Sequence, residues 1–184
     1  MTAYSASPPK VFPSLKYRQG ERRDAGLWMI RRTQGRSTGQ RLAGEREIES
    51  KLEIQTYVID KLRELRNLPY DWDGAGGSPV SQDVAQAAYR ALDRIADFRT
   101  VFPFITPGEE GSVLLEWRAG RERIELEFFP DDAPFVRHVD SDGHVRINGA
   151  LGDSGTGYGE VRRSLSNLSS RIWVANPGWK SLFS

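Results

Sequence analysis

Residues 113–128 read VLLEWRAGRERIELEF, and this stretch decides the fold class. Apolar and polar side chains alternate on both sides of Ala119-Gly120, which is the pattern of two strands with one buried face each. A two-residue turn at Ala119-Gly120 places Glu116 opposite Arg123 on the outer face, where the two charges attract each other. The stretch therefore predicts an antiparallel hairpin that turns one face toward a core.

Helices and a second hairpin are predicted around this first hairpin. Residues 135–139 and 145–147 form the second hairpin, with an Asp-Gly turn between them. Apolar residues recur at helical spacing in 45–67, in 81–98 and in 159–173. This order predicts an α+β fold: an antiparallel meander of four to five strands, covered on one face by helices.

Several large apolar residues are expected in the core of this fold. Trp72, in the glycine-rich connection 70–79, and Trp117 each continue an apolar pattern, so both are predicted to be buried. The tail after Pro177 is apolar enough to dock on the domain. The first predicted helix presents an apolar stripe that is expected to face the core, formed by Ile48, Leu52, Ile59 and Leu62 and widened by Val58 and Leu65.

The charge is divided unevenly along the chain. Residues 1–46 hold ten Lys/Arg and three acids, a net charge of +7, while the remaining residues hold 16 Lys/Arg and 22 acids, a net charge of −6. We therefore predict two parts, an extended basic arm rich in Pro, Gly and Ser at 1–44 and a single α+β domain at 45–184. A basic arm on an acidic body predicts an anionic macromolecular partner.

The arm also contains a short apolar segment between pairs of arginines. A protein partner is favoured because this segment is more apolar than contact with phosphates requires, although nucleic acid remains an alternative partner for 1–44. The candidate partner-binding residues are Arg22, Arg23, Leu27, Trp28, Met29, Arg31, Arg32 and Arg36.

Composition limits the other classes of function. The chain has no cysteine, which excludes disulfides, thiolate zinc sites and cysteine nucleophiles. No run approaches the roughly 20 apolar residues that span a bilayer, and the N-terminus lacks the apolar run of a signal peptide. We therefore expect a cytoplasmic protein with no membrane partner.

Four motifs suggest chemistry, and each has a simpler structural interpretation. Ser154 in Gly-Asp-Ser-Gly resembles a protease nucleophile, but the histidines lie just upstream of it and the chain is too short for that fold. The glycines of 74–77 precede a helix as in a phosphate-binding loop, yet the loop lacks the P-loop lysine. Both segments are predicted to be connections.

The other two motifs are clusters of titratable residues. Histidines and aspartates around the second hairpin could ligate a metal ion: Asp131, Asp132, His138, Asp140, Asp142 and His144. Glu116, Glu125 and Glu127 on adjacent strands are similar to acids that hold magnesium in nucleases, but the lysine that accompanies such acids is absent. Alternation and turn chemistry explain both groups, so no catalytic residue, metal or cofactor is predicted, and no small-molecule substrate is identified.

Residues 60–130 resemble a group of small bacterial proteins without an assigned chemistry. The resemblance rests on Leu68–Gly76 with its Trp-Asp-Gly, on Phe104–Pro107 and on Leu115-Glu116-Trp117. It implies an accessory protein of the toxin–antitoxin or mobile-element kind. The prediction is thus a non-enzymatic, antitoxin-like or inhibitory protein that binds another protein through its arm and domain. A nucleic-acid-binding accessory protein is the alternative, and a metal-dependent hydrolase is the least favoured.

Overall fold

The computed structural model describes residues 38–108, 110–152 and 155–183, with side chains from residue 45 onward. Among these residues, no helix is long and apolar enough to cross a membrane. The elements confirm the predicted α+β fold. They are, in order, α2 (Thr38–Arg66), α3 (Gln82–Ile95), β1 (Phe104–Pro107), β2 (Val113–Ala119), β3 (Glu122–Phe128), β4 (Phe135–Val139), β5 (Val145–Ala150), α4 (Tyr158–Ala175) and the 3-10 helix η1 (Trp179–Leu182).

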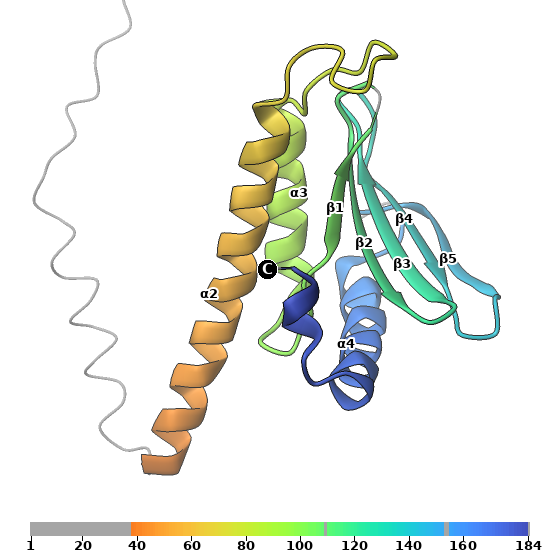
Figure 1. Cartoon of the computed structure of the whole chain (residues 1–184). Coiled ribbons are helices and arrows are strands. Elements are labelled where there is room, and N and C mark those ends of the chain that lie inside the picture. The colour runs from red at the N-terminus through yellow and green to blue at the C-terminus, as the bar shows by residue number, and fades with distance from the viewer. Residues whose placement is uncertain (1–37, 109, 153–154, 184) are drawn as a thin grey trace, which may run out of the picture. The chain divides into compact units, whose positions relative to one another are not determined.

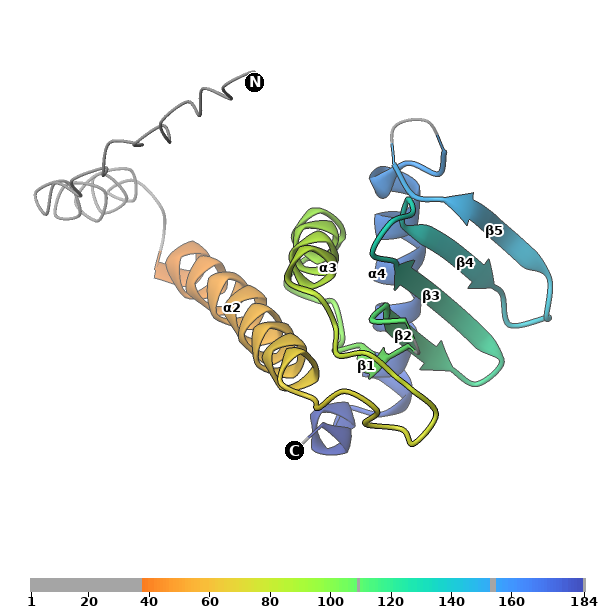
Figure 2. The same ribbon diagram turned by 90° about the horizontal axis from the view of Figure 1, so that it is seen from above.

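The strands form one antiparallel meander in the order β1-β2-β3-β4-β5 (Figure 1). Leu115, Leu126 and Val136 lie side by side across its centre and are completely buried. Helices α3 and α4 cover this face, and α2 lies farther out against α3 (Figure 2). The described domain is therefore layered as sheet, helix pair and outer helix.

The first hairpin turns one residue later than predicted. Ala119 pairs with Glu122, so the turn is Gly120-Arg121, and Glu116 lies opposite Glu125 instead of Arg123. Gly120 has a φ of 65°, and a two-residue turn with glycine at its first position matches the twist of the strands. The pairing shifts by an even number, so the predicted buried face is preserved.

Helix α3 matches its prediction at the start and ends earlier than expected. The Ser81 hydroxyl accepts a hydrogen bond from the amide of Val84 at 3.2 Å, which confirms the expected N-cap. Val84, Leu92 and Ile95 are buried. The helix ends at Ile95, so Phe98 lies in the connection to β1 and is 38% exposed.

Helix α2 differs from the predicted helix 45–67 in its start and in its buried face. It begins at Thr38 and ends at Arg66, and the division of the chain at residue 44 stays a prediction. The expected core stripe is wrong at Ile48, Leu52 and Ile59, which are 59%, 55% and 38% exposed. It is right at Val58 and Leu62, which are buried, and Ile54 joins them, so the core face runs through i, i+4 and i+8.

The two tryptophans expected in the core behave differently. Trp117 is 1% exposed, and its indole N–H donates to the carbonyl of Val101 at 2.9 Å. Trp72 is only half-buried and does not join the core cluster, so that prediction is wrong. Its indole N–H donates to the Ser78 carbonyl at 3.3 Å, which holds the ring within its own loop.

The C-terminal tail docks on the domain as predicted. Trp179 is 2% exposed and makes an edge contact with the ring of Phe102, 5.0 Å between centroids. Phe183 contacts Tyr57 of α2 in the same way. Tyr57 also donates from its hydroxyl to the Pro103 carbonyl at 2.9 Å. The tail and the approach to β1 therefore anchor α2 to the rest of the domain.

Candidate functional site

The eight residues predicted to bind a partner, Arg22 to Arg36, lie outside the described residues, as does Ser154. The arm hypothesis therefore stays a prediction. The other sequence candidates fall within the described part of the chain.

The Trp-Asp-Gly loop uses its amides internally. The Asp73 carboxylate accepts hydrogen bonds from the amides of Ala75 and Gly77, both at 2.9 Å. The Asp71 carboxylate accepts one from Gly76 at 2.7 Å. These backbone hydrogen bonds lower the pKa of Asp73, and they occupy the amides that would cradle a phosphate. The structural interpretation of the loop is therefore favoured.

His138 is separated from the other metal candidates and joins a buried cluster. Its Nε2 lies 3.1 Å from the Glu122 carboxylate, which also pairs with Arg171 of α4. Glu122 and His138 are 4% and 8% exposed, and Nδ1 of His138 has no hydrogen-bond partner in the described structure. Burial lowers the pKa of His138, Asp140 raises it and Arg146 lowers it further. The cluster ties the sheet to α4.

Asp140, Asp142 and His144 are the candidate metal ligands that the structure brings together. One ligand atom from each lies within 4.8 Å of the others. However, Asp140 already accepts backbone hydrogen bonds from Asp142 and His144, both at 2.9 Å, and one from the Arg146 side chain at 2.5 Å. The His144 amide, followed by Arg146, lowers the pKa of Asp140 to about 2. These bonds explain the acid as part of the turn.

Two of the three acids on the open sheet face, Glu116 and Glu125, are paired with arginines. Glu116 pairs with Arg118 at 2.5 Å and more distantly with Arg123 at 3.9 Å. Arg123 also pairs with Glu125 at 3.1 Å, so one guanidinium bridges the two carboxylates. Burial, followed by the charge of Glu125, raises the pKa of Glu127. Cations therefore occupy the place where a magnesium ion would have to bind.

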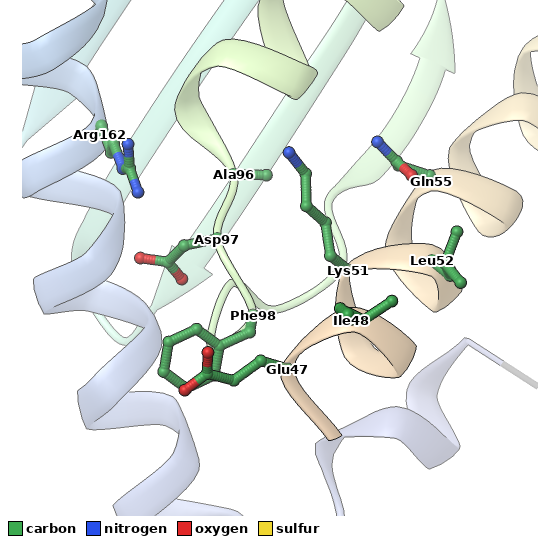
Figure 3. A pocket seen from close by; sticks show the side chains of 9 residues that line it. All are labelled: Glu47, Ile48, Lys51, Leu52, Gln55, Ala96, Asp97, Phe98 and Arg162. Atoms are coloured by element: carbon green, nitrogen blue, oxygen red, sulfur yellow. The ribbon is translucent and has the colours of Figure 1, made fainter. Parts of the chain in front are cut away.

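A hollow beside α2 gathers exposed apolar side chains, and Figure 3 shows it from close by. Its volume is about 340 Å³, and it lies between α2, the α3–β1 connection and α4. Ile48 and Leu52 of α2 line it together with Phe98, and all three are exposed. Charged groups surround them: Glu47, Lys51, Asp97 and Arg162.

A second, separate hollow of about 410 Å³ lies between α2 and α3, farther along α2. Ile59, Ala85 and Tyr89 contribute apolar surface, and the arginines at its rim are Arg63, Arg66 and Arg90. Ile59 follows Ile48 and Leu52 at helical spacing, so all three lie on one stripe of α2. We name the two hollows together the α2–α3 groove.

A polar bridge joins α2 to α3 through Lys51 and Gln55, which line the first hollow. Lys51 pairs with Asp93 of α3 at 3.0 Å, and the Gln55 side-chain amide donates to the same carboxylate at 3.0 Å. Both bonds are solvent-exposed, so they cost little to rearrange. The bridge leaves the apolar residues of the two hollows exposed.

Sequence reasoning missed the α2–α3 groove because it assigned the exposed stripe of α2 to the core. A signal was present: residues 48–62 of α2 hold more apolar residues than one core-facing stripe can use. Comparison with protein-family models, with curated proteins and with solved structures finds no match for this chain.

Proposed function

We propose that this chain is a non-enzymatic protein-binding protein, of the antitoxin-like or accessory kind. Its α+β domain binds an apolar segment of another protein in the α2–α3 groove, and the basic arm supplies further contacts. The observation that carries the proposal is the exposure of Ile48, Leu52 and Phe98 around one hollow.

Exposed apolar side chains that line one hollow indicate a binding surface, whereas apolar side chains scattered singly over a surface do not. Contiguous apolar patches rimmed by polar groups are typical of protein interaction sites. More than half of the surface of Ile48 and of Leu52 is exposed to water, whereas Ile54 and Val58 of the same helix are buried in the core. Covering this surface with a partner removes it from water, which contributes about 25 cal/mol per Å².

The surroundings of the titratable clusters support a non-enzymatic role. Glu122 and His138 are held by each other and by Arg171, and Glu116 is held by arginines. Asp140 organises its own turn. Each cluster thus has a structural task, and the α2–α3 groove is lined by apolar, amide and exposed charged side chains instead.

Photo-cross-linking in living cells tests the proposal. A photoreactive amino acid replaces Leu52 in one variant and Val174 in the other. Val174 is a matched control because it is apolar, 85% exposed and outside the residues that line the groove. We expect position 52 to yield a discrete protein adduct that resists nuclease, is absent at position 174 and is lost when Ile48→Asp is added.

Three outcomes contradict the proposal. Equal adducts at both positions, or no adduct at position 52, would remove the groove as the binding surface. Submicromolar binding of mixed-sequence DNA or RNA at physiological salt would favour the nucleic-acid alternative. That binding should weaken with salt, with a log–log slope of roughly −0.9 per duplex phosphate contact.

A further inference from the structure

We infer that the partner segment is an acidic amphipathic helix whose carboxylates lie over Arg63, Arg66 and Arg90. This inference rests on the proposed function and adds the chemistry of the partner. Three features of the α2–α3 groove carry it: arginines at one end whose partners are neutral or weakly paired, an apolar stripe of helical length, and mixed charge at the other end.

The arginine end lacks negative charge among the described residues that line it. Arg66 donates to the amide oxygen of Gln82 at 3.4 Å, and Arg90 donates to that of Gln86 at 3.0 Å. Both acceptors are neutral. Arg63 pairs with Asp60 on its own helix at 2.9 Å, with both side chains more than half exposed, so the pair is weak. Guanidinium groups in this state favour carboxylates, which they bind in a bidentate manner.

The apolar stripe fits a helix. Ile48 and Ile59 are separated by eleven residues, which correspond to about 16 Å along α2 or three turns. A partner helix with apolar residues at i, i+4 and i+7 can lie along a groove between two helices. Nucleic acid is disfavoured as the occupant because phosphate contacts make no use of Leu52 and Ile59.

The end of the groove away from the arginines carries balanced charge, so the two ends differ in their attraction for acidic residues. Glu47 and Asp97 line that hollow together with Lys51 and Arg162, so opposite charges are balanced there. Acidic residues of a partner therefore gain attraction at the arginine end and little at the other. The expected partner helix has its carboxylates gathered toward one end.

Selection from a phage-displayed library tests this inference. The library holds 18-residue helices with apolar residues fixed at helical spacing and with all other positions randomised. The full-length chain is the target, and a full-length Leu52→Glu/Ile59→Glu variant, with its fold checked by circular dichroism, removes clones that bind elsewhere. We expect the surviving clones to carry two or more acidic residues near one end.

Matched charge variants then locate the contact. Arg63→Gln/Arg66→Gln/Arg90→Gln should weaken binding of an acidic clone roughly tenfold, because each exposed pair contributes modestly. Arg46→Gln/Arg121→Gln/Arg163→Gln removes equal charge from exposed arginines outside the residues lining the groove, and it should change the Kd less than about twofold.

Groove-dependent clones that are neutral or basic at both ends would overturn the inference and leave the proposed function standing. Equal losses in the two triple variants would also overturn it, since they would indicate long-range attraction without contact. Failure to obtain any groove-dependent clone would count against both the inference and the proposed function.

Discussion

The core and the α2–α3 groove draw apolar side chains from the same helix, α2, yet they treat them in opposite ways. Ile54 and Val58 are completely buried against the domain. Ile48, Leu52 and Ile59 are exposed on a neighbouring stripe and line hollows. The comparison shows that hydrophobic periodicity identifies the apolar faces of a helix. It does not show whether such a face is covered by the rest of the chain or by another protein.

The largest expected effect concerns the centre of the core. Trp117→Ala should lower the free energy of unfolding by about 3–5 kcal/mol, because it leaves a cavity and removes the donor to Val101. Urea unfolding measures this change. Trp72→Ala is the control and should cost less than half as much, because Trp72 is outside the core cluster. Equal losses would place Trp72 in the core after all.

The next effect compares the two stripes of α2 directly. Ile54→Ala should cost about 2–4 kcal/mol, since it removes a completely buried side chain. Ile59→Ala makes the same chemical change at a 38% exposed position and should cost less than about 1 kcal/mol. Chemical denaturation of both variants tests the difference, and similar costs would show that both stripes stabilise the fold.

A smaller effect concerns the pH dependence of stability that the buried side chain of His138 causes. The pKa of His138 is lowered in the folded state, so the fold favours the neutral ring. Its contribution to stability is therefore complete above the unfolded pKa of about 6.5 and is lost as the pH falls through the folded value.

Unfolding free energies measured across this pH range test the role of His138. His138→Gln should remove the part of the pH dependence that lies just below neutrality. His144→Gln is the control for loss of a histidine, because this side chain is 71% exposed. An unchanged pH profile in His138→Gln would show that burial of the His138 ring does not favour its neutral form.

Much of the fold could be predicted because its signals are local. Alternation in 113–128 identifies the hairpin and its buried face, and Ser81 marks the start of α3. The exact turn was missed, since the left-handed conformation of Gly120 outweighs the better pairing of Glu116 with Arg123. Trp72 was misplaced because hydrogen bonds within its loop hold it there.

The candidate site could be predicted only in part, because it depends on contacts distant in sequence. The apolar residues of the groove were recognised, but Ile48 and Leu52 were assigned to the core. Whether α3 covers a stripe of α2 depends on how the two helices pack, and this is not encoded in the periodicity of α2 alone. Arg171 likewise joins Glu122 across 49 residues, a pairing that no local pattern indicates.

The most direct test of the central claim is the urea unfolding of an Ile48→Gln/Leu52→Gln variant. Glutamine keeps the helix propensity of α2 and removes the apolar surface of the groove. We predict a loss below about 1 kcal/mol, because the exposed stripe is open to a partner and adds little to the fold. A loss above about 3 kcal/mol, the cost of a core substitution, would contradict the account.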